Sequence, residues 1–541
     1  MKASTDLKAL YKQKGLPEKP DIIVILTDQE RYPAHWPTGF VNSLTAWNKL
    51  KANGLTFERA YTSACMCTPS RGVMITSNYA NLTGLSMTPG ELSYADPRIP
   101  QLAAMMQAEG YDVIWKGKWH LSTPADVMQW SPYDIGNMQR QYGFSDWNPP
   151  DAGTVTGFST YESWATAGSG TPGHANPAND KRYLRKYAVG VDAHGFGEDA
   201  HEFLRKRAEG RNKQDVAAQK PFLMFMSFVN PHDINFFPDG WQSLGYSEAD
   251  ICDLPIELPP NAHDSLLDKP TIQSHIRNIM NRGTPLRGQD TLAEGTTWPS
   301  AQVDKADTIE NYVKFYAFMT LFANGCVNEF LGYLDKYGFT EKSLIIRTAD
   351  HGEMGMSHGM REKVYNVYEE TIHIPFVISN PLLFPKAQTT QALYAHVDFL
   401  PTLINLAGGH ATRLMKGKSL VPAILDPSKE VQDTVLFCYD DESAMISDLQ
   451  YLSHIRAIRH RHHTYAVYFS PNLPGQYQYE MYDLDTEPKQ LVNLLAHAKP
   501  ANPEVEKLWP QLQDLLNEKL IEAGQTPFPP IVDGVGMKAT G

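Results

Sequence analysis

The sequence predicts an α/β protein: a large, doubly wound and mostly parallel sheet flanked by helices, followed by a small antiparallel sheet with a helix. Four apolar runs of strand length, separated by helical patterns, predict the large sheet. Short strands at regular spacing after residue 427 predict the small one. The chain has 541 residues, 42% of them hydrophobic and 20% charged, and can therefore bury a large core.

Each of the four apolar runs ends in polar residues. The run at 21–26 is rich in β-branched residues and typical of a central strand that is buried on both faces. The runs at 113–115, 222–228 and 343–349 follow the same scheme. Because the carboxyl ends of parallel strands meet at one edge of an open sheet, we expect a shared site there. The polar residues in question are Asp28, Gln29, Lys118, His120, His232, Asp350 and His351.

Helical patterns at 43–53, 101–109 and 309–337 lie between these runs. Two insertions interrupt this alternation of predicted strands and helices. The stretch 122–192 is either a surface insertion or a lid whose aromatic residues contact an organic leaving group. The stretch 238–299 has mixed polarity and proline breaks, and we assign it no structure. The aromatic residues of the first insertion are Trp130, Tyr133, Trp147, Tyr161 and Trp164.

The expected organisation has three parts. Residues 1–427 form the catalytic α/β domain, and residues 428–523 form the small α+β domain, which ends in a helix from about residue 503. Residues 524–541 contain several prolines and cannot form a core alone, so they are either disordered or an extended oligomerisation arm.

Net charge, hydrophobic runs and cysteine content limit the binding partners and the cellular compartment that we expect. A net charge of −13 argues against broad nucleic-acid binding but not against an anionic substrate, since salt screens distant surface charges. The first twenty residues hold no signal-peptide core, and no later run reaches membrane-spanning length. The five cysteines are widely spread. We therefore expect a cytoplasmic protein with free thiols that binds no membrane.

The stretch 67–77 is the focus of the predicted chemistry. Thr68 is suited to cap a helix and Pro69 to occupy its first position, so a helix N-terminus faces Cys67. Arg71, one turn in, can bind two oxygens of an oxyanion at once. These features together predict a site for an anionic, tetrahedral group. A zinc cluster at Cys65 and Cys67 is disfavoured because no further ligand lies at zinc-site spacing nearby.

Residues 67–76 resemble the sulfatase signature, Cys-x-Pro-Ser-Arg followed by Thr, with Ser77 at a place where the family usually has Gly. Four further segments are similar to family landmarks, so the resemblance covers most of the chain. They are Gly-Lys-Trp-His-Leu at 117–121, Asp-His-Gly at 350–352 with Lys363 downstream, 396–403 and 481–484.

The resemblance implies that Cys67 is oxidised to formylglycine by a formylglycine-generating enzyme, and that one divalent cation binds beside it. The cation would be held by Asp28, Gln29, Asp350, His351 and position 67. Carboxylates and a carboxamide suit calcium, whereas the histidine shifts the balance toward manganese, so Mn²⁺ and Ca²⁺ both stay open.

The implied mechanism starts with attack on sulfur or phosphorus by the hydrated formylglycine, which the metal and Arg71 activate. Lys118 and Lys363 would meet the developing charge, and His232 or Lys363 would protonate or stabilise the leaving alcohol. His120 would take a proton from the second hydroxyl. Ordinary structural roles are the alternatives: a core histidine, a turn after Pro231 and a surface ion pair of Lys363.

We expect hydrolysis of aryl or alkyl sulfate monoesters. Gln29 and His351 depart from the usual pattern and resemble the phosphonate monoester hydrolase branch of the same alkaline phosphatase superfamily, so phosphonate monoesters or phosphodiesters are the alternative. That branch is commonly oligomeric, which implies a homo-oligomer. A non-catalytic anion-binding protein is a remote third reading.

Overall fold

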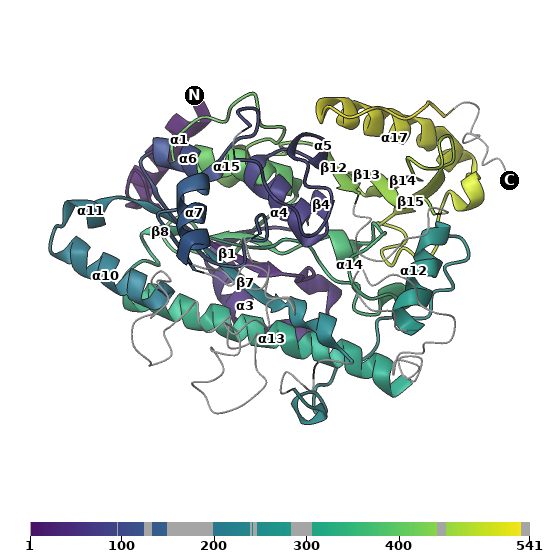
Figure 1. The fold of residues 1–541 in the computed structure, drawn as a ribbon, viewed down its shortest axis with the longest axis horizontal. Coiled ribbons are helices and arrows are strands. Elements are labelled where there is room, and N and C mark those ends of the chain that lie inside the picture. The colour runs from purple at the N-terminus through teal and green to yellow at the C-terminus, as the bar shows by residue number, and fades with distance from the viewer. Residues whose placement is uncertain are drawn as a thin grey trace.

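The computed structural model describes residues 2–94, 96–123, 132–148, 199–238, 241, 246–282, 306–440 and 451–531. Within these ranges the strands form an eight-stranded sheet, a five-stranded sheet and a two-stranded ladder (Figure 1). In that part of the chain, no helix combines the length and apolar character that crossing a bilayer demands.

Four parallel strands form the centre of the large sheet, in the order β8 (Ser343–Ala349), β1 (Asp21–Asp28), β7 (Phe222–Pro231) and β5 (Asp112–Gly117). β1 pairs in parallel with both β7 and β8, and β5 pairs in parallel with β7. These strands are the four apolar runs of the sequence. Their carboxyl ends therefore lie side by side at one edge of the sheet, as predicted.

The outer strands complete a mostly parallel sheet. β6 (Asp146–Asn148) continues it in parallel beyond β5. On the other side, β9 (Phe376–Ser379) runs antiparallel to both β8 and β2 (Gly54–Phe57). β10 (Gln388–Thr390) lies parallel to β2 at the far edge. The predicted fold class is confirmed.

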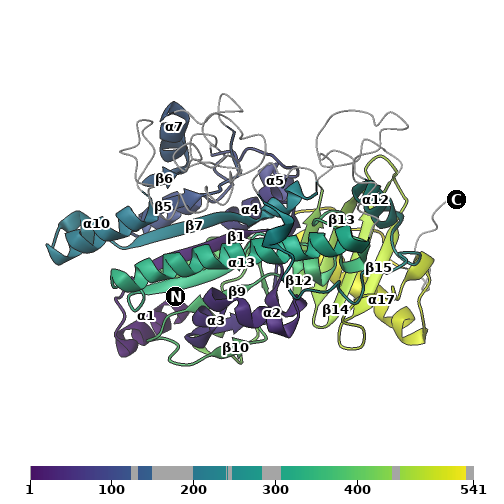
Figure 2. The same cartoon turned by 90° about the horizontal axis from the view of Figure 1, so that it is seen from below.

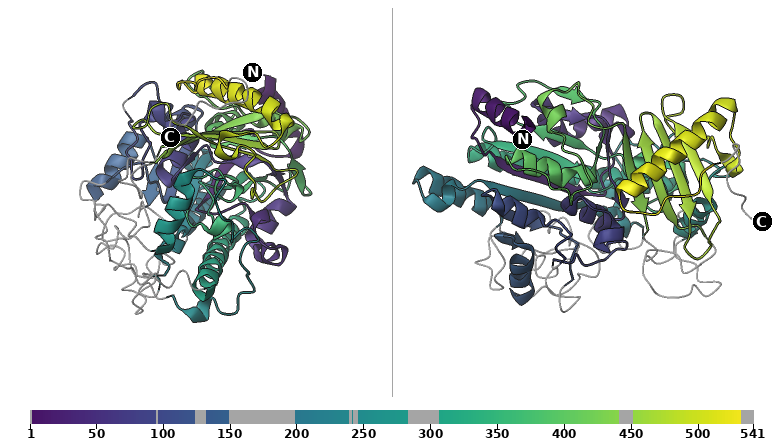
Figure 3. Two further views of the ribbon diagram at one scale, coloured as in Figure 1. Left: turned by 90° about the vertical axis from the view of Figure 1, so that its right-hand side faces the viewer. Right: turned by 90° about the horizontal axis from the view of Figure 1, so that it is seen from above.

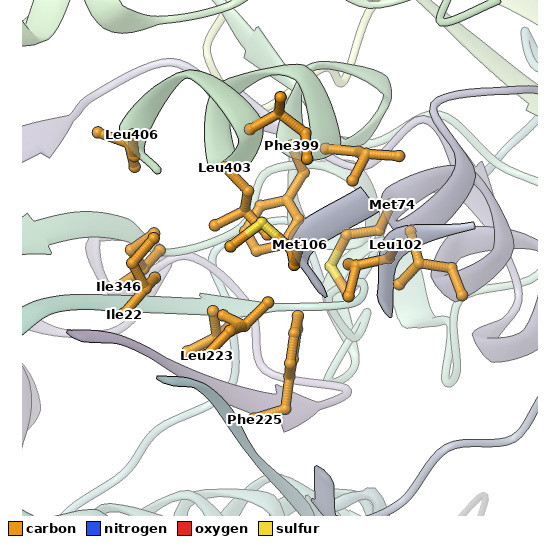
Figure 4. Close-up of a cluster of buried hydrophobic side chains, with 14 of the residues drawn as sticks. Ile22, Met74, Leu102, Met106, Leu223, Phe225, Ile346, Phe399, Leu403 and Leu406 are labelled. Atoms are coloured by element: carbon orange, nitrogen blue, oxygen red, sulfur yellow. The ribbon is translucent and has the colours of Figure 1, made fainter. Parts of the chain in front are cut away.

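Side chains of β1 alternate between two cores, which explains why the whole run is apolar. Ile22 packs with Leu223 of β7 and with α15 (Phe399–Leu406) on one face, where α6 (Leu102–Ala108) also contributes (Figure 4). Ile23 packs on the other face.

Helices α3 (Thr45–Ala52) and α13 (Ala306–Lys336) cover that second face (Figure 2). α10 (Ala200–Asn212) adds Phe203 and Leu204 to the same core. With helices on both faces, the large sheet is doubly wound.

The small sheet has the order β15-β14-β13-β12-β4 and carries α17 (Pro503–Glu522) on one face (Figure 3). Its antiparallel strands are β12 (Thr434–Tyr439), β13 (His454–His460), β14 (His463–Phe469) and β15 (Gln478–Asp483).

The fifth strand of the small sheet, β4 (Ala64–Cys65), comes from the other end of the chain and pairs in parallel with β12. Two residues are too few to show a periodicity, so the sequence does not reveal this strand. The predicted segment 428–523 thus supplies four of the five strands.

The first insertion contributes α7 (Pro132–Tyr142) as well as β6. Trp147 is fully buried in the core beside the large sheet, so neither of the two readings of this insertion, a surface segment or a lid, applies to Trp147. Tyr133, in contrast, is 69% exposed. The other aromatic residues of this insertion, Trp130, Tyr161 and Trp164, lie outside the described residues.

The second insertion contains η5 (Glu248–Asp250) and α12 (Thr271–Arg282). The described start of the tail lies against α17, where the Phe528 N–H donates to Asn517 Oδ1 over 2.8 Å. The rest of the predicted arm, 532–541, is outside the described residues.

The predicted helix at 43–53 is in fact the end of α2 (Thr38–Ser43) followed by α3. The remaining described elements are α1 (Lys2–Lys14), η1 (Pro33–His35), β3 (Ala60–Tyr61), α4 (Cys67–Thr76), α5 (Ala80–Thr83), α11 (Val216–Gln219), η3 (His232–Phe236), η7 (Ser357–Gly359), α14 (Glu369–Ile372), β11 (Tyr394–Ala395), η8 (His396–Asp398), α16 (Val421–Leu425) and η9 (Ala496–Ala498).

Candidate active site

Cys67 is the first residue of α4, whose N-terminus faces the carboxyl edge of the large sheet. Its thiol is buried, with Sγ 3.7 Å from Asp28 Oδ1 and 3.2 Å from His351 Nε2. The residue before the helix is Met66, and no side chain caps it. Thr68 was expected to be the cap but lies inside the helix, where its hydroxyl donates to the His120 carbonyl over 2.8 Å.

Ser77 ends α4 in a left-handed conformation with φ 55°, a region in which glycine is the unstrained choice. The Ser77 hydroxyl donates to the Val397 carbonyl over 2.6 Å and accepts from the Gly417 N–H over 3.0 Å. These two hydrogen bonds offset part of the strain.

Four side chains form a candidate metal site. The ligand atoms of Asp28, Cys67, Asp350 and His351 all lie within 4.8 Å of one another. His351 Nδ1 is 3.0 Å from the Gly352 carbonyl, which can only accept, so Nδ1 carries the proton and the Nε2 lone pair faces the other three groups. Burial lowers the pKa of His351 and keeps the ring neutral.

The two carboxylates differ in their electrostatic surroundings. Burial would raise the pKa of Asp28, but Lys118, His232 and Arg71 together hold it well below its ordinary value. Burial and the nearby Asp28 raise the pKa of Asp350. Two buried acidic groups and an imidazole lone pair thus converge on one point, a donor set that fits a divalent cation.

Arg71 makes four hydrogen bonds to the protein itself. Its guanidinium donates to Asp350 Oδ2 over 2.9 Å, Asp28 Oδ2 over 3.0 Å, the Lys118 carbonyl over 2.7 Å and Ser227 Oγ over 3.0 Å. The expectation that Arg71 grips two oxygens of the bound oxyanion therefore does not match the geometry. Arg71 instead fixes the two carboxylates of the metal site.

Lys118 contacts the same Asp28 oxygen as Arg71, with Nζ 2.8 Å from Oδ2 and both side chains fully buried. Its ammonium is thus close to the Cys67 thiol. Burial, followed by Asp28, raises the pKa of Cys67 to about 12, although Lys118 and Lys363 act against the shift. The surrounding protein groups therefore keep the thiol protonated at neutral pH, and a protonated thiol is a poor nucleophile.

Gln29 lies next to the candidate metal site, at φ 67°. Its backbone N–H donates to Asp350 Oδ1 over 3.1 Å. Its carboxamide faces elsewhere: Nε2 donates to Glu353 Oε2 over 2.5 Å, and Oε1 accepts from Lys363 Nζ over 2.6 Å. The described contacts show Gln29 orienting Lys363, and its place among the metal ligands stays a prediction.

Lys363 is buried, which argues against the surface ion pair considered as its alternative. Its ammonium lies 3.0 Å from Glu362 Oε2. Burial works against the charged form, but Glu362, Cys67 and Asp28 outweigh it and raise the pKa of Lys363. The structure therefore places a second permanent cation beside the thiol.

His120 and His232 are both buried at this edge. Burial, then the charge of Lys118, holds the pKa of each well below its ordinary value of 6.5. Both rings are consequently neutral at pH 7 and can accept a proton. His232 Nε2 lies 3.3 Å from the Asn235 carboxamide, one turn further along η3.

Four supporting residues were not assigned roles from the sequence. Ser70 Oγ donates to the Asp350 carbonyl over 2.6 Å, and His396 Nε2 lies 3.0 Å from the same oxygen. Ser227 contacts Arg71, and Asn235 contacts His232. Ser70 and His396 lie within recognised motifs, which is a signal, whereas Ser227 and Asn235 carry none.

Family models and curated relatives match most of the chain. The family model described as Sulfatase matches residues 20–409, and a model described as N-sulphoglucosamine sulphohydrolase, C-terminal, matches residues 356–519. The Ulvan-active sulfatase of Formosa agariphila is 26% identical, over 95% of this chain and 83% of that protein. The N-acetylglucosamine-6-O-sulfatase of Bacteroides thetaiotaomicron is 23% identical, over 94% and 87% respectively.

Solved structures share the fold. One protein, captured in complex with its substrate D-glucosamine-2-N,6-O-disulfate, superposes with a TM-score of 0.64 at 18% identity, over 94% of this chain and 98% of that one. The phosphonate monoester hydrolase of Agrobacterium radiobacter gives a TM-score of 0.63 at 18% identity, over 93% and 96%.

Proposed function

Because the chain belongs to the sulfatase family and is a sulfuric ester hydrolase, we propose that it cleaves sulfate monoesters at Cys67 matured to formylglycine. The observation that carries this proposal is the position of Cys67. Its side chain starts a helix and lies within 4.8 Å of three candidate metal-ligand groups. Two buried lysine ammonium groups lie around the same thiol.

Asp28, Asp350 and His351 would hold the divalent cation. Two carboxylates and one imidazole fit Mn²⁺ or Ca²⁺, and the choice between them is part of the test. When bound, such a cation polarises an ester oxygen and lowers the pKa of a hydroxyl beside it. A formylglycine at position 67 would supply a hydrated aldehyde as the nucleophile.

The two lysines would bind the anionic group of the substrate. Lys118 and Lys363 are buried cations on different elements, so they can meet negative charge that develops on the equatorial oxygens. Arg71 takes no part in this contact, since it holds Asp28 and Asp350 in place. Its role is positioning.

Proton transfer would fall to the remaining basic groups. His120 is neutral and buried, which suits a proton acceptor near position 67. His232 is neutral as well, so in the resting enzyme its ring carries no additional proton to donate to the leaving alcohol. Lys363 is charged, and we therefore assign it the stabilisation of the leaving oxygen, with His232 orienting that group.

A phosphonate monoester or phosphodiester substrate is the second candidate. The observation that favours it is His351, whose Nε2 belongs to the candidate metal site. A phosphonate monoester hydrolase among the structural neighbours fits this alternative.

The leaving group is proposed from the relatives. Two of them are named for carbohydrate substrates, an ulvan and an N-acetylglucosamine sulfate. We propose a sulfated sugar as the natural ester, with aryl sulfates as convenient probes.

The test compares kcat/KM for an aryl sulfate and for the matching aryl phosphonate monoester. The enzyme is protein whose formylglycine content is measured by peptide mass, with Cys67→Ala as the control. A preference for the sulfate by orders of magnitude supports the proposal. A preference for the phosphonate favours the second candidate. An unmodified Cys67 together with an empty metal site would instead support a non-catalytic anion-binding protein.

Location and assembly are also proposed. We propose a cytoplasmic homo-oligomer matured by a formylglycine-generating enzyme. Sedimentation of the full chain and of a chain ending at Gly524 tests the oligomerisation arm, because an unchanged subunit number after truncation contradicts it.

A further inference from the structure

A second cluster of potential metal ligands lies outside the catalytic constellation. It consists of His35 at the end of η1, of Glu369 at the start of the single turn α14, and of His373, which directly follows that turn. The facing ligand atoms of these three residues lie within 4.8 Å of one another. None of the three takes part in the proposed hydrolysis.

The spacing of the three atoms fits a metal coordination sphere. His35 Nε2 is 3.2 Å from His373 Nδ1, which in turn is 3.3 Å from Glu369 Oε2. Tetrahedral zinc binds imidazole nitrogen and carboxylate oxygen at about 2.0–2.1 Å, which puts neighbouring ligand atoms ~3.3 Å apart. The two separations at His373 match edges of such a tetrahedron, and the third pair, His35 and Glu369, lies within 4.8 Å.

Hydrogen bonds among the three residues do not satisfy all three ligand atoms. His373 Nε2 lies 3.0 Å from the Glu58 carbonyl, which can only accept, so the proton of the neutral ring is on Nε2 and Nδ1 is bare. The bare nitrogen then faces a carboxylate oxygen. His35 Nε2–H can donate to this bare nitrogen over 3.2 Å, but no proton then lies between Nδ1 and Glu369 Oε2, which are 3.3 Å apart. A cation satisfies all three atoms together.

The ligand atoms are held rigidly by their surroundings. The His373 ring is stacked on Tyr32, with centroids 3.9 Å apart, and on Tyr61, with centroids 5.1 Å apart. Glu369 is oriented by the Tyr61 hydroxyl at 3.3 Å and by Arg459 Nε at 3.3 Å. Donation by the outer ring nitrogen of a histidine to a backbone carbonyl is the usual support of a metal-binding imidazole.

We propose that His35, Glu369 and His373 form a second metal site that binds Zn²⁺ or a similar divalent transition metal ion. Two imidazoles and one carboxylate are the ligand types that zinc prefers over calcium. His35 is partly buried whereas the other two are buried, so the fourth ligand could be a water on the His35 side.

Such an ion would link two segments that build the active site. His35 follows the loop that carries Asp28 and Gln29, and α14 is hydrogen-bonded to the loop after Asp350, where the Glu353 N–H donates to the Glu370 carbonyl over 2.9 Å. The proposed role is therefore structural. The bound ion would fix the segments that follow β1 and β8 relative to each other.

The experiment measures bound metal in the full-length protein by mass spectrometry of the elements, and zinc affinity by calorimetric titration with ZnCl₂. His35→Gln and His373→Gln remove proposed ligands, and His410→Gln is the matched control at an exposed histidine. Asp350→Asn disables the candidate catalytic site, so zinc binding there is counted separately. Co²⁺ replaces zinc to report tetrahedral coordination by its visible absorption.

We expect Asp350→Asn to keep one zinc ion per chain, and adding His35→Gln to weaken zinc binding at least ~100-fold. His410→Gln should bind like the parent protein. The proposal is overturned if Asp350→Asn binds no zinc, or if adding His35→Gln to Asp350→Asn leaves zinc bound as tightly as adding His410→Gln does. Should His373→Gln fail to fold, the partly exposed position of His35 still provides the decisive variant.

Discussion

Replacing Lys118 by methionine tests the electrostatic part of the proposed mechanism. The side chain is fully buried and its ammonium lies 2.8 Å from Asp28 Oδ2. Methionine keeps most of the length and the apolar stem but removes the charge. Asp28 keeps its partner Arg71, at 3.0 Å, so the carboxylate is not left without a cation.

The magnitude follows from the distance over which the charge acts. A unit charge about 4 Å from developing negative charge contributes about 4 kcal/mol at an effective dielectric constant of about 20. Removing one donor from a preorganised anion site costs about 3–4 kcal/mol in measured cases. With a tenfold change in rate for each 1.36 kcal/mol, kcat/KM should fall roughly 10²- to 10³-fold.

The assay is kcat/KM on an aryl sulfate, with formylglycine and metal content matched between variants. Lys116→Met is the control, because Lys116 lies two residues earlier, is equally buried, and pairs with Asp146 instead. It should stay within about threefold of the parent. If Lys118→Met also stays within that range, or if both variants lose activity equally, the assigned role of Lys118 is refuted.

Other predictions concern the nucleophile, the metal, the two histidines and Arg71. Cys67→Ala should lose nearly all turnover while its circular dichroism and melting temperature stay close to the parent; retained turnover would contradict the mechanism. Chelation should abolish activity and lower the melting temperature, because two buried carboxylates then face each other, and Mn²⁺ or Ca²⁺ should restore both; full activity in metal-free protein would rule out the site. The acid limb of kcat/KM should lie below pH 6.5, since the pKa values of His120 and His232 are held below 6.5 and only protonation of these rings removes the proton acceptor; a limb centred at 6.5 would argue against this assignment. Arg71→Lys should lower kcat more than it raises KM, because Arg71 contacts the carboxylates; a rise in KM alone would indicate direct substrate binding.

Most of the candidate site could be predicted from the sequence, because its residues directly follow the predicted parallel strands. The apolar run before Asp28 and the one before Asp350 are each too regular to be loops, and two adjacent parallel strands bring their ends together. Lys118 follows from the same argument, because it comes after the apolar run at 113–115, and the family resemblance added the chemistry of Cys67. Both arguments depend on the chain order alone and need no side-chain orientation.

Side-chain direction is what the sequence could not supply. Arg71 was expected to face the substrate, yet it turns to the carboxylates because four acceptors surround its guanidinium. Trp147 lies in a stretch for which the sequence left a surface insertion and a lid both open, yet β6 inserts it into the core. In both cases the outcome depends on neighbours that are distant in the chain, and no local pattern encodes them.

The pairing of β4 with β12 has a consequence for how the protein is made. Cys65 pairs with Tyr439, so the strand before Cys67 cannot be completed until nearly the whole chain has been translated. At about 5–20 residues per second, that delay lasts roughly 20–75 s. In the finished fold the Cys67 side chain is 2% exposed and out of reach of another enzyme. The proposed oxidation of Cys67 would therefore have to take place before the chain has finished folding.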